Sequence, residues 1–318
     1  MAKRGILFLL TIICLLIIAC LIFYCKNNSK NENKIINIVF TTDINYKDYL
    51  KTTIRSAIAN KNEDSVYNIN IICVDLPKSE EDKFRKFESK NVHINPVSVS
   101  LEDIKDVGNY EVSYFVTRAD LFKFFIPELF PKLDKILYID VDVAIMKDLT
   151  DLYNTDLKDK FMAVVNKPIM EYSAEGYTIF GKYFPKRERH YNCGVMLLNL
   201  KLWRENDITQ ALVDEKNEKN ETDLMTQYVF NTVLPQSKIK SLAPINNVFT
   251  QWDDVMFKKY HFWFAYLPYC ITGVKCSYKN LIKDAVIIHY LDAQKPWKFR
   301  ENNTSKYWLQ YEKKEDYE

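Results

Sequence analysis

Residues 135–142 read Lys-Ile-Leu-Tyr-Ile-Asp-Val-Asp, and this stretch decides the fold class. Its first part is a short apolar run, which is typical of a strand buried on both faces of a sheet. Asp140 and Asp142 follow at once, in the only Asp-x-Asp of the chain, with more apolar residues at 143–145. An arbitrary Asp-x-Asp is as often solvated as functional, but ionised carboxylates among apolar neighbours need a compensating charge. The stretch therefore predicts a buried strand that ends in a candidate cation site.

The sequence on either side alternates between strand and helix patterns. Apolar runs rich in β-branched residues predict strands, and apolar residues three and four apart predict helices. The predicted strands cover residues 35–40, 69–74, 92–99, 161–165, 194–198 and 285–288, and the predicted helices cover 50–58, 79–88 and 118–130. Pro96 places the strand at 92–99 at an edge or a bulge. This alternation indicates an α/β fold with a mixed, mostly parallel sheet flanked by helices.

Composition excludes several classes of function. The 318 residues include only 6 glycines, and none of them has the spacing of G-x-G-x-x-G or of G-x-x-x-x-G-K-[ST], the two common phosphate-binding loops. The 4 histidines stand alone, which excludes an H-E-x-x-H zinc helix. A net charge of +2 gives no basic field for nucleic acid. The 7 cysteines are interpreted as mostly small core residues rather than a disulfide framework.

The N-terminus carries an apolar run of 21 residues at 5–25, after a short basic segment (1–4) and before a polar linker (26–34). This length spans a membrane as a helix, so we predict an uncleaved transmembrane signal-anchor. A cleaved signal peptide is the alternative, because residues 17–20 (Ile-Ile-Ala-Cys) are similar to a bacterial lipoprotein cleavage site, although the run continues beyond them. Basic residues on both sides leave the orientation open. The folded body starts near Ile35.

Polar groups follow three of the predicted strands. They are the Thr-Thr-Asp-Ile-Asn segment at residues 41–45, the Asp-Val-Asp at 140–142, and His289. Ligands of open α/β sheets bind at the carboxyl ends of strands. Two carboxylates and an imidazole suit a divalent ion such as Mn²⁺, which can neutralise a diphosphate as a leaving group. A lone histidine at a strand end is usually a satisfied core or surface residue, so the combination carries this prediction.

Five segments between residues 35 and 300 resemble one family, in the same order along the chain. They are residues 38–46 (Ile-Val-Phe-Thr-Thr-Asp-Ile-Asn-Tyr), 113–121 (Ser-Tyr-Phe-Val-Thr-Arg-Ala-Asp-Leu), 135–142, 191–200 (Tyr-Asn-Cys-Gly-Val-Met-Leu-Leu-Asn-Leu, followed by Trp203-Arg204), and His289-Tyr290 with Lys295-Pro296-Trp297. Together they resemble glycosyltransferase family 8, which includes lipopolysaccharide galactosyl- and glucosyltransferases and glycogenin. The resemblance implies a GT-A catalytic domain over residues 35–300, with a polar C-terminal tail over 301–318.

The resemblance also implies roles for single residues. The ligands of Mn²⁺, with Mg²⁺ as the alternative, would be Asp140, Asp142 and His289. The remaining contacts to a UDP-sugar donor would come from Thr41, Thr42, Asp43 and Asn45 at the uridine end, from Val141 within the Asp-x-Asp, from Arg118 and Lys295 near the diphosphate, and from Asn192 and Gln227 beside the transferred sugar.

Two positions depart from the family pattern. The family usually has Asp-Gln-Asp, two further residues and Asn on a helix beneath the donor, whereas residues 226–231 read Thr-Gln-Tyr-Val-Phe-Asn. Thr226 thus replaces an acid that helps to hold the donor sugar. Asp223 lies about one helical turn earlier, and we expect it to substitute. Asp292 replaces the glycine of the closing motif.

The leading hypothesis is a metal-dependent, retaining hexosyltransferase that moves galactose or glucose from its UDP form to a glycan, lipid-linked saccharide or glycoprotein acceptor. The first alternative, motivated by Thr226, is an inactive UDP-sugar-binding member of the same fold. The second is a glycoside hydrolase, although carboxylates as close as Asp140 and Asp142 suit one metal better than two sides of a glycosidic bond. The anchor would place the body at the bacterial inner membrane, facing the cytoplasm, or in the Golgi lumen as a type II protein.

Overall fold

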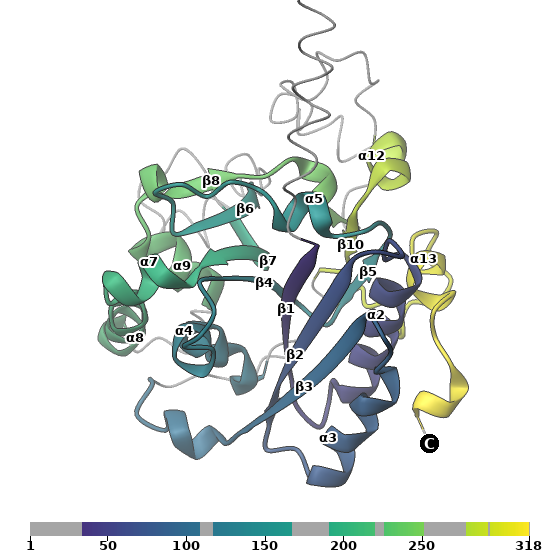
Figure 1. Ribbon diagram of the computed structural model, residues 1–318, viewed down its shortest axis with the longest axis horizontal. Coiled ribbons are helices and arrows are strands. Elements are labelled where there is room, and N and C mark those ends of the chain that lie inside the picture. The colour runs from purple at the N-terminus through teal and green to yellow at the C-terminus, as the bar shows by residue number, and fades with distance from the viewer. Residues whose placement is uncertain are drawn as a thin grey trace, which may run out of the picture. The chain divides into compact units, whose positions relative to one another are not determined.

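The predicted strand at residues 135–139 is β4 (Lys135–Ile139), one of seven strands of the main sheet in the computed structural model (Figure 1). The structure describes residues 34–108, 117–166, 191–219, 226–250, 278–291 and 293–317. The other strands of this sheet are β1 (Ile35–Thr42), β2 (Val66–Val74), β3 (Val92–Val99), β6 (Met162–Asn166), β7 (Tyr191–Asn199) and β8 (Ile239–Ser241).

The order of these strands is β3-β2-β1-β4-β7-β6-β8, so β4 is central. β1 pairs in parallel with β2 and β4, and β2 pairs in parallel with β3. β7 runs antiparallel to both of its neighbours, while β8 is parallel to β6. The prediction of a mixed, mostly parallel sheet is therefore confirmed. Pro96 lies in β3, at the edge of the sheet, where its missing N–H costs no ladder bond.

A second, three-stranded sheet holds the last predicted strand. Its members are β5 (Val143–Ile145), β9 (Val248–Phe249) and β10 (Ile287–His289), in the order β5-β10-β9. β10 runs antiparallel to β5 and parallel to β9. The chain thus leaves the main sheet at the end of β4 and enters the second sheet at Val143. The Asp-x-Asp spans the gap between the two sheets.

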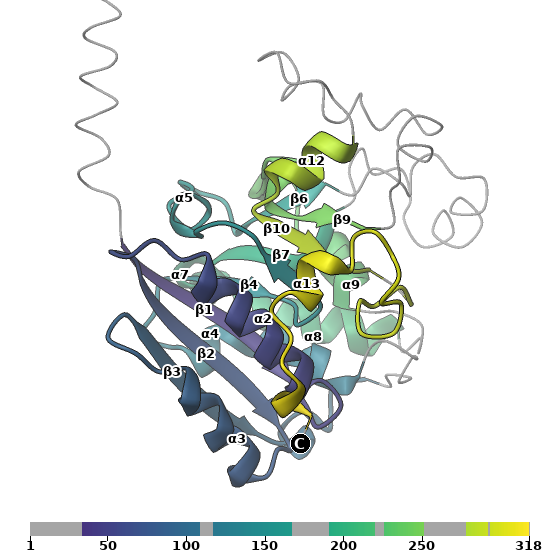
Figure 2. The same cartoon turned by 90° about the vertical axis from the view of Figure 1, so that its right-hand side faces the viewer.

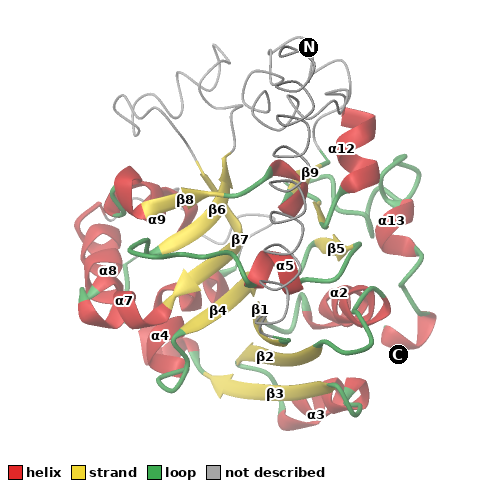
Figure 3. Cartoon of the chain, turned by 45° about the horizontal axis from the view of Figure 1, so that its top comes forward, coloured by secondary structure: helices red, strands yellow, loops and turns green. Residues whose placement is uncertain are grey.

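Helices pack on both faces of the main sheet (Figures 2 and 3). One face is covered by α2 (Lys47–Ala59), α3 (Lys78–Phe84) and α5 (Thr150–Tyr153). On the same side, α12 (Tyr278–Asp284) packs next to the turn at residues 244–246, and α13 (Lys306–Leu309) packs next to α2 and β5. The other face is covered by the 3-10 helix η4 (Arg118–Phe125), α4 (Ile126–Leu129), α7 (Leu200–Glu205), α8 (Ile208–Lys219) and α9 (Thr226–Val233). Shorter 3-10 turns are η2 (Arg85–Phe87), η3 (Leu101–Ile104), η6 (Gln236–Lys238), η7 (Pro244–Asn246) and η8 (Lys314–Asp316).

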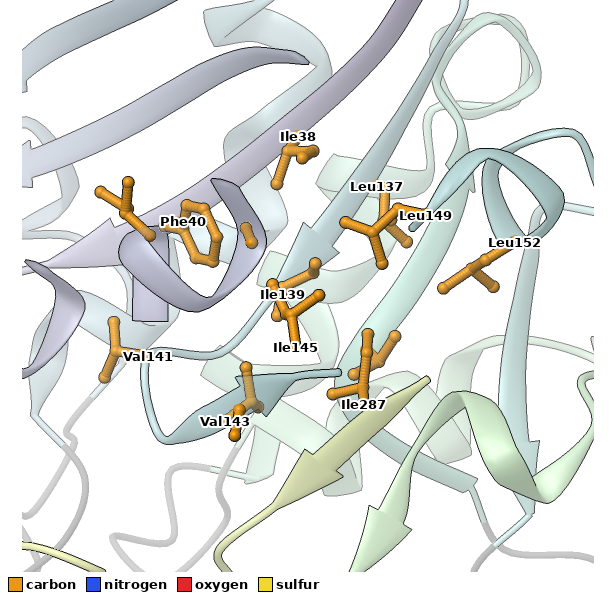
Figure 4. Packing of buried hydrophobic residues seen from close by; sticks show 14 of the residues in the cluster. Ile38, Phe40, Leu137, Ile139, Val141, Val143, Ile145, Leu149, Leu152 and Ile287 are labelled. Carbon is orange, nitrogen blue, oxygen red and sulfur yellow. The ribbon is translucent and has the colours of Figure 1, made fainter. Parts of the chain in front are cut away.

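This double cover explains the apolar run of β4. Leu137 and Ile139 point to the face that α2 covers, beside Ile38 of β1 (Figure 4). Ile136 and Tyr138 point to the opposite face, which η4 and α9 cover. Because side chains alternate along a strand, burial on both faces requires an uninterrupted apolar sequence. The run ends where the chain reaches the edge of this core and the two aspartates begin.

The predicted helix at residues 118–130 differs in the structure. It consists of η4 followed by a short α4, with the change at Phe125–Ile126. Pro127 explains the break, because proline has no N–H to donate and its ring collides with the carbonyl four residues earlier in a continuous helix. The predicted helix at 79–88 likewise shortens to α3 with the turn η2 after it.

The two ends of the chain differ in what the structure describes. The predicted anchor at residues 5–25 lies outside the described residues and stays a prediction, as does the linker up to residue 33. No helix within the described ranges is long and apolar enough to cross a membrane. The predicted polar tail packs on the body, because Trp308 is fully buried and Arg55 donates two charged hydrogen bonds to the Asp316 carboxylate.

Candidate active site

The pairing of β5 with β10 brings the three predicted metal ligands together. Val143 lies opposite His289 in this antiparallel pair, directly after Asp142. One donor atom from each of Asp140, Asp142 and His289 falls in a group whose members all lie within 4.8 Å of one another. His289 Nε2 is 3.2 Å from Asp142 Oδ1 and 3.7 Å from Asp140 Oδ2. The three side chains converge on one point, as the sequence predicted.

Gly194 leaves room for these side chains. A Cβ atom at this position in β7 would lie 2.1 Å from His289 Cε1 and 2.6 Å from Asp140 Oδ2. No side chain fits at such distances without moving two of the three candidate ligands. Asp140 is also held from behind, because its backbone N–H donates to the Gly194 carbonyl at 2.8 Å. Glycine is therefore a steric requirement of the site rather than a requirement of the backbone conformation.

A chain of amide side chains orients His289. The backbone N–H of Gly194 can only donate, and it bonds Asn192 Oδ1 at 3.0 Å. Asn192 Oδ1 also accepts from Asn247 Nδ2 at 2.9 Å, so the carbonyl oxygen of Asn247 is the atom that faces His289 Nδ1, at 3.0 Å. His289 Nδ1–H then donates to this oxygen. The lone pair of Nε2 is left facing the two aspartates, which is the tautomer that a metal ligand needs.

The same chain continues to Gln227 on α9. Asn192 Nδ2 donates to Gln227 Oε1 at 2.9 Å, and the backbone N–H of Cys193 approaches the same oxygen at 3.4 Å. Asn192, Asn247 and His289 are almost completely buried. A continuous line of hydrogen bonds thus joins His289 to Gln227, the two residues for which the resemblance implies roles at the metal and at the transferred sugar.

Lys295 supplies a positive charge beside the aspartates. Its Nζ forms a very short contact with Asp142 Oδ2 and donates to the Tyr290 carbonyl at 2.8 Å. Burial alone would raise the pKa of the Asp142 carboxyl, but the positive charge of Lys295, which also donates a hydrogen bond to it, outweighs burial and holds that pKa well below its usual range. Asp142 is therefore ionised, as a metal ligand has to be.

A second buried lysine joins this cluster to another acid. Lys123 Nζ on η4 lies 2.5 Å from Asp120 Oδ1 and 2.9 Å from Asp140 Oδ1, and it packs 4.9 Å from the centre of the Tyr138 ring. Asp120 also accepts a very short hydrogen bond from the hydroxyl of Thr226 on α9. Burial would lower the pKa of Lys123, but Asp120 and Asp140 raise it above its usual value, so the ammonium stays charged.

These groups line one cavity of about 190 Å³. We name its two sides by their elements. The strand wall comprises Asp140, Asp142, Gly194 and His289, and the helix wall comprises Asp120, Lys123, Thr226 and Gln227. Nine of the predicted site residues line the cavity, namely Thr41, Thr42, Asp140, Val141, Asp142, Asn192, Gln227, His289 and Lys295.

The other predicted residues lie elsewhere. Asp43 does not line this cavity; its Oδ1 accepts from the backbone N–H groups of Asn45 and Tyr46 at 2.9 and 3.2 Å, which shapes the turn before α2. Asn45 is exposed, and Arg118 is absent from the lining, although its neighbours on either side belong to it. The expected substitute Asp223, and Asp292, lie outside the described residues.

Residues that were not predicted also belong to the site. Tyr46, Asp120 and Lys123 line the cavity, and Asn247 orients His289 from behind. Asp120 and Lys123 follow Arg118 by two and five residues. The prediction therefore found the right part of the chain, but it assigned the charged contact to Arg118 instead of to these two residues. Asn247 carries no signal in the sequence, because its role depends on β9 lying next to β10. Tyr46 directly follows the Thr-Thr-Asp-Ile-Asn segment.

The cluster fits a divalent cation. Two carboxylate oxygens and one imidazole lone pair that face each other repel unless a cation lies between them. The hydroxyl of Thr41, which is buried in the same cavity, has no hydrogen-bond partner among the described residues. An unpaired buried hydroxyl is costly, so its placement suits a bound polar ligand. The candidate metal ligands and the Thr41 hydroxyl thus line the same cavity.

Comparisons with known proteins show the family and the fold. The model of the family "Glycosyl transferase family 8" matches residues 37–301. Glycosyltransferase GlyA of Streptococcus pneumoniae is 26% identical over 82% of this chain, a match that spans 32% of the length of GlyA. Lipopolysaccharide 1,2-glucosyltransferase of Escherichia coli is 25% identical over 84% of this chain and 74% of its own length. The crystal structure of galactosyltransferase LgtC with donor and acceptor sugar analogs superposes with a TM-score of 0.65 at 20% identity, covering 87% of this chain and 95% of LgtC.

Proposed function

The chain belongs to glycosyltransferase family 8, and from this we propose that it transfers a hexose, galactose or glucose, from a UDP-sugar to a glycan or lipid-linked saccharide, with retention at the anomeric carbon. The observation that carries the proposal is the convergence of Asp140, Asp142 and His289 on one point beside Lys295. The names of relatives that act on lipopolysaccharide and on galactose support the substrate class.

The strand wall would hold the metal and, through it, the diphosphate of the donor. Asp140, Asp142 and His289 would ligate Mn²⁺, or Mg²⁺ as the alternative, and a bound divalent ion stabilises the negative charge of a departing diphosphate. Lys295 adds a fixed positive charge next to Asp142, and two of its three N–H donors are used by Asp142 and Tyr290. Its charge therefore favours an anionic ligand in the cavity.

Retention is most simply reached without a covalent intermediate. An amide oxygen is a weak nucleophile, and Gln227 Oε1 already accepts hydrogen bonds from Asn192 and Cys193, which weakens it further. In the proposed step the bond from the anomeric carbon to the diphosphate oxygen breaks. The acceptor hydroxyl oxygen forms its new bond on the same face and gives its proton to the departing diphosphate. Asn192 and Gln227 would hold the sugar in place for this exchange.

The variant Asp142→Asn tests the proposal. Loss of one ligand charge is expected to lower Mn²⁺-dependent turnover of UDP-galactose or UDP-glucose by at least about a hundredfold. Release of UDP is measured with and without Mn²⁺, and the protein's Tm shows whether the variant folds. Asp151→Asn serves as the matched control, because Asp151 is an exposed acid of α5 close by in the sequence. Unchanged turnover of Asp142→Asn would exclude the assigned site.

Two other outcomes separate this proposal from its alternatives. Mn²⁺-dependent binding of UDP without transfer of a sugar to any acceptor would support the first alternative, an inactive donor-binding member of the family, which Thr226 motivated. Hydrolysis of a glycoside without metal would favour a glycoside hydrolase, which needs two carboxylates on opposite sides of the bond.

The place of the reaction is also a proposal. UDP-sugars are available in the bacterial cytoplasm, so we propose that residues 5–25 anchor the chain in the inner membrane with the body on the cytoplasmic side. The Golgi lumen, with a type II orientation, is the alternative. Protease treatment of spheroplasts distinguishes the two sides of the bacterial membrane, since a cytoplasmic body stays protected.

A further inference from the structure

The helix wall holds a carboxylate, Asp120, at the point where the resemblance led us to expect one from α9 but where α9 presents Thr226. We propose that Asp120 binds hydroxyl groups of the donor hexose and sets which hexose is accepted. This inference rests on the proposed function and adds to it a residue that selects the sugar. Three observations carry it, namely the position of Asp120 in the cavity, its pairing with Thr226, and its distance from the metal ligands.

The position of Asp120 follows from its contacts. Its side chain lines the cavity and is 17% exposed. One of its oxygens meets Lys123 at 2.5 Å, and the other accepts from the Thr226 hydroxyl. A carboxylate has about four lone-pair positions, so Asp120 can accept hydrogen bonds from a ligand in the cavity as well as from groups of the wall.

The pairing with Thr226 explains how α9 can lack its acid. The hydroxyl and the carboxylate are bonded to each other across the wall, one from η4 and one from α9. An Asp–Thr pair presents one carboxylate and one hydroxyl to a ligand, whether the aspartate comes from η4 or from α9. The helix wall therefore still contains an acid, which η4 supplies instead of α9. Asp120 takes the place for which we had expected Asp223.

The distance to the metal ligands fits a sugar. Only the ammonium of Lys123 separates Asp120 from Asp140, a candidate metal ligand. In a UDP-sugar the hexose is bonded directly to the phosphate that the metal would hold, so its ring has to lie next to the metal site. Gln227, the neighbour of Thr226, reaches the other end of the same wall. Hydroxyl groups are good donors to a carboxylate, and such charged hydrogen bonds are stronger than neutral ones.

A purely structural role for Asp120 makes a different prediction. If Asp120 only compensated Lys123, its loss would weaken folding and would affect every ligand of the cavity alike. If it binds the hexose, its loss affects ligands that carry the sugar and spares those that do not. UDP and UDP-hexose differ by this group alone, so their comparison isolates the contact.

The first test is Asp120→Asn, which keeps the volume of the side chain and an oxygen to accept from Thr226. Dissociation constants for UDP, UDP-glucose and UDP-galactose are measured calorimetrically with Mn²⁺, and Tm is recorded. We expect the affinity for UDP to stay within about twofold, and that for the preferred UDP-hexose to fall about ten- to a hundredfold, as for a lost charged hydrogen bond. Asp82→Asn is the control, because Asp82 is an exposed acid on α3.

The second test exchanges the two groups. Asp120→Thr alone is expected to lose affinity for the hexose, and the double variant Asp120→Thr with Thr226→Asp is expected to recover it to within a few fold of the wild type. The double variant also restores the charge beside Lys123, so it remains informative where the single variant does not fold. Equal losses for UDP and UDP-hexose, or no recovery in the double variant, would overturn the inference. A wild-type protein that binds neither UDP nor UDP-hexose would overturn the proposed function itself, and this inference with it.

Discussion

The strand wall and the helix wall of the cavity are built in different ways. Asp140, Asp142 and His289 are positioned by backbone pairing, since β4, β5, β7 and β10 fix where each residue emerges. The helix wall is positioned by contacts between side chains, such as Lys123 with Asp120 and Thr226 with Asp120. A wall fixed by the backbone tolerates little change in its residues. A wall fixed by side-chain pairs can receive its acid from either of two elements, and Asp120 beside Thr226 illustrates this.

Two links join the walls. Lys123 is a charged link, because its ammonium contacts Asp120 on one side and Asp140 on the other. The amides of Asn247 and Asn192 form an uncharged link between His289 and Gln227. The difference between the walls can therefore be tested at the strand wall itself and at each link in turn.

The largest effect is expected for Gly194→Ala. The added Cβ would lie 2.1 Å from His289 Cε1, so the ring has to leave its position, and the cluster of ligands is lost. We expect the affinity for Mn²⁺ to fall by at least about a thousandfold, which corresponds to about 4 kcal/mol of binding free energy. Isothermal titration of Mn²⁺ checks this, with circular dichroism to confirm the fold.

Cys193→Ala is the control for Gly194→Ala, because Cys193 is the adjacent buried residue of β7 and also lines the cavity. Its affinity for Mn²⁺ should match the wild type. If Gly194→Ala bound Mn²⁺ normally, the strand wall would be adaptable, and the contrast between the walls would not hold.

The next effect is expected for Lys123→Met. Methionine matches the length of the lysine stem but leaves Asp120 and Asp140 without their shared cation. We expect the free energy of unfolding to fall by roughly 3 kcal/mol, as for a broken buried ion pair, and both Mn²⁺ and UDP-hexose to bind more weakly. Urea denaturation and calorimetry measure these quantities. Lys123→Arg keeps the charge and should lose much less; a change in only one of the two affinities would show that Lys123 does not link the walls.

The sequence predicted the strand wall better than the helix wall, because strand pairing positions the first and contacts between side chains position the second. Residues 135–142 and His289 lie at strand ends, and strands are readable from apolar runs and alternate burial. The pairing that brings His289 to Val143 is not local, but the carboxyl ends of strands gather at a predictable edge. Two carboxylates and a histidine at such ends were therefore enough to indicate one site.

The helix wall depends on contacts that the sequence does not encode locally. The resemblance indicated the segment around Arg118, and its first part is a 3-10 helix rather than the predicted α-helix. Asp120 and Lys123, which are three residues apart, both line the cavity, whereas Arg118 is not part of the lining. Asn247 was not foreseeable, because its neighbour His289 is 42 residues away.

The smallest of these effects is expected for Asn247→Ala, which breaks the uncharged link. Asn247 lies behind His289 and accepts a hydrogen bond from its Nδ1–H. The variant therefore removes the hydrogen bond that selects the tautomer, while all three candidate metal ligands keep their side chains. In an unconstrained histidine side chain the proton favours Nε2, the atom that has to bind the metal, so without Asn247 the ring has to adopt the less stable tautomer by itself. We expect the affinity for Mn²⁺ to fall about ten- to a hundredfold, as is typical when the partner of a ligating histidine is removed.

Asn246→Ala is the matched control, since Asn246 precedes it at the end of η7 and is only half-buried. Calorimetry with Mn²⁺ measures both variants, and Tm separates a loss of fold from a loss of orientation. Because Asn247 also donates to Asn192, the affinity for UDP-hexose in the presence of saturating Mn²⁺ should fall by a few fold as well. An equal loss of Mn²⁺ affinity in both variants would contradict a specific role of Asn247, because β9 would then support the site only by packing against β10. Lys123 would remain as the link between the two walls.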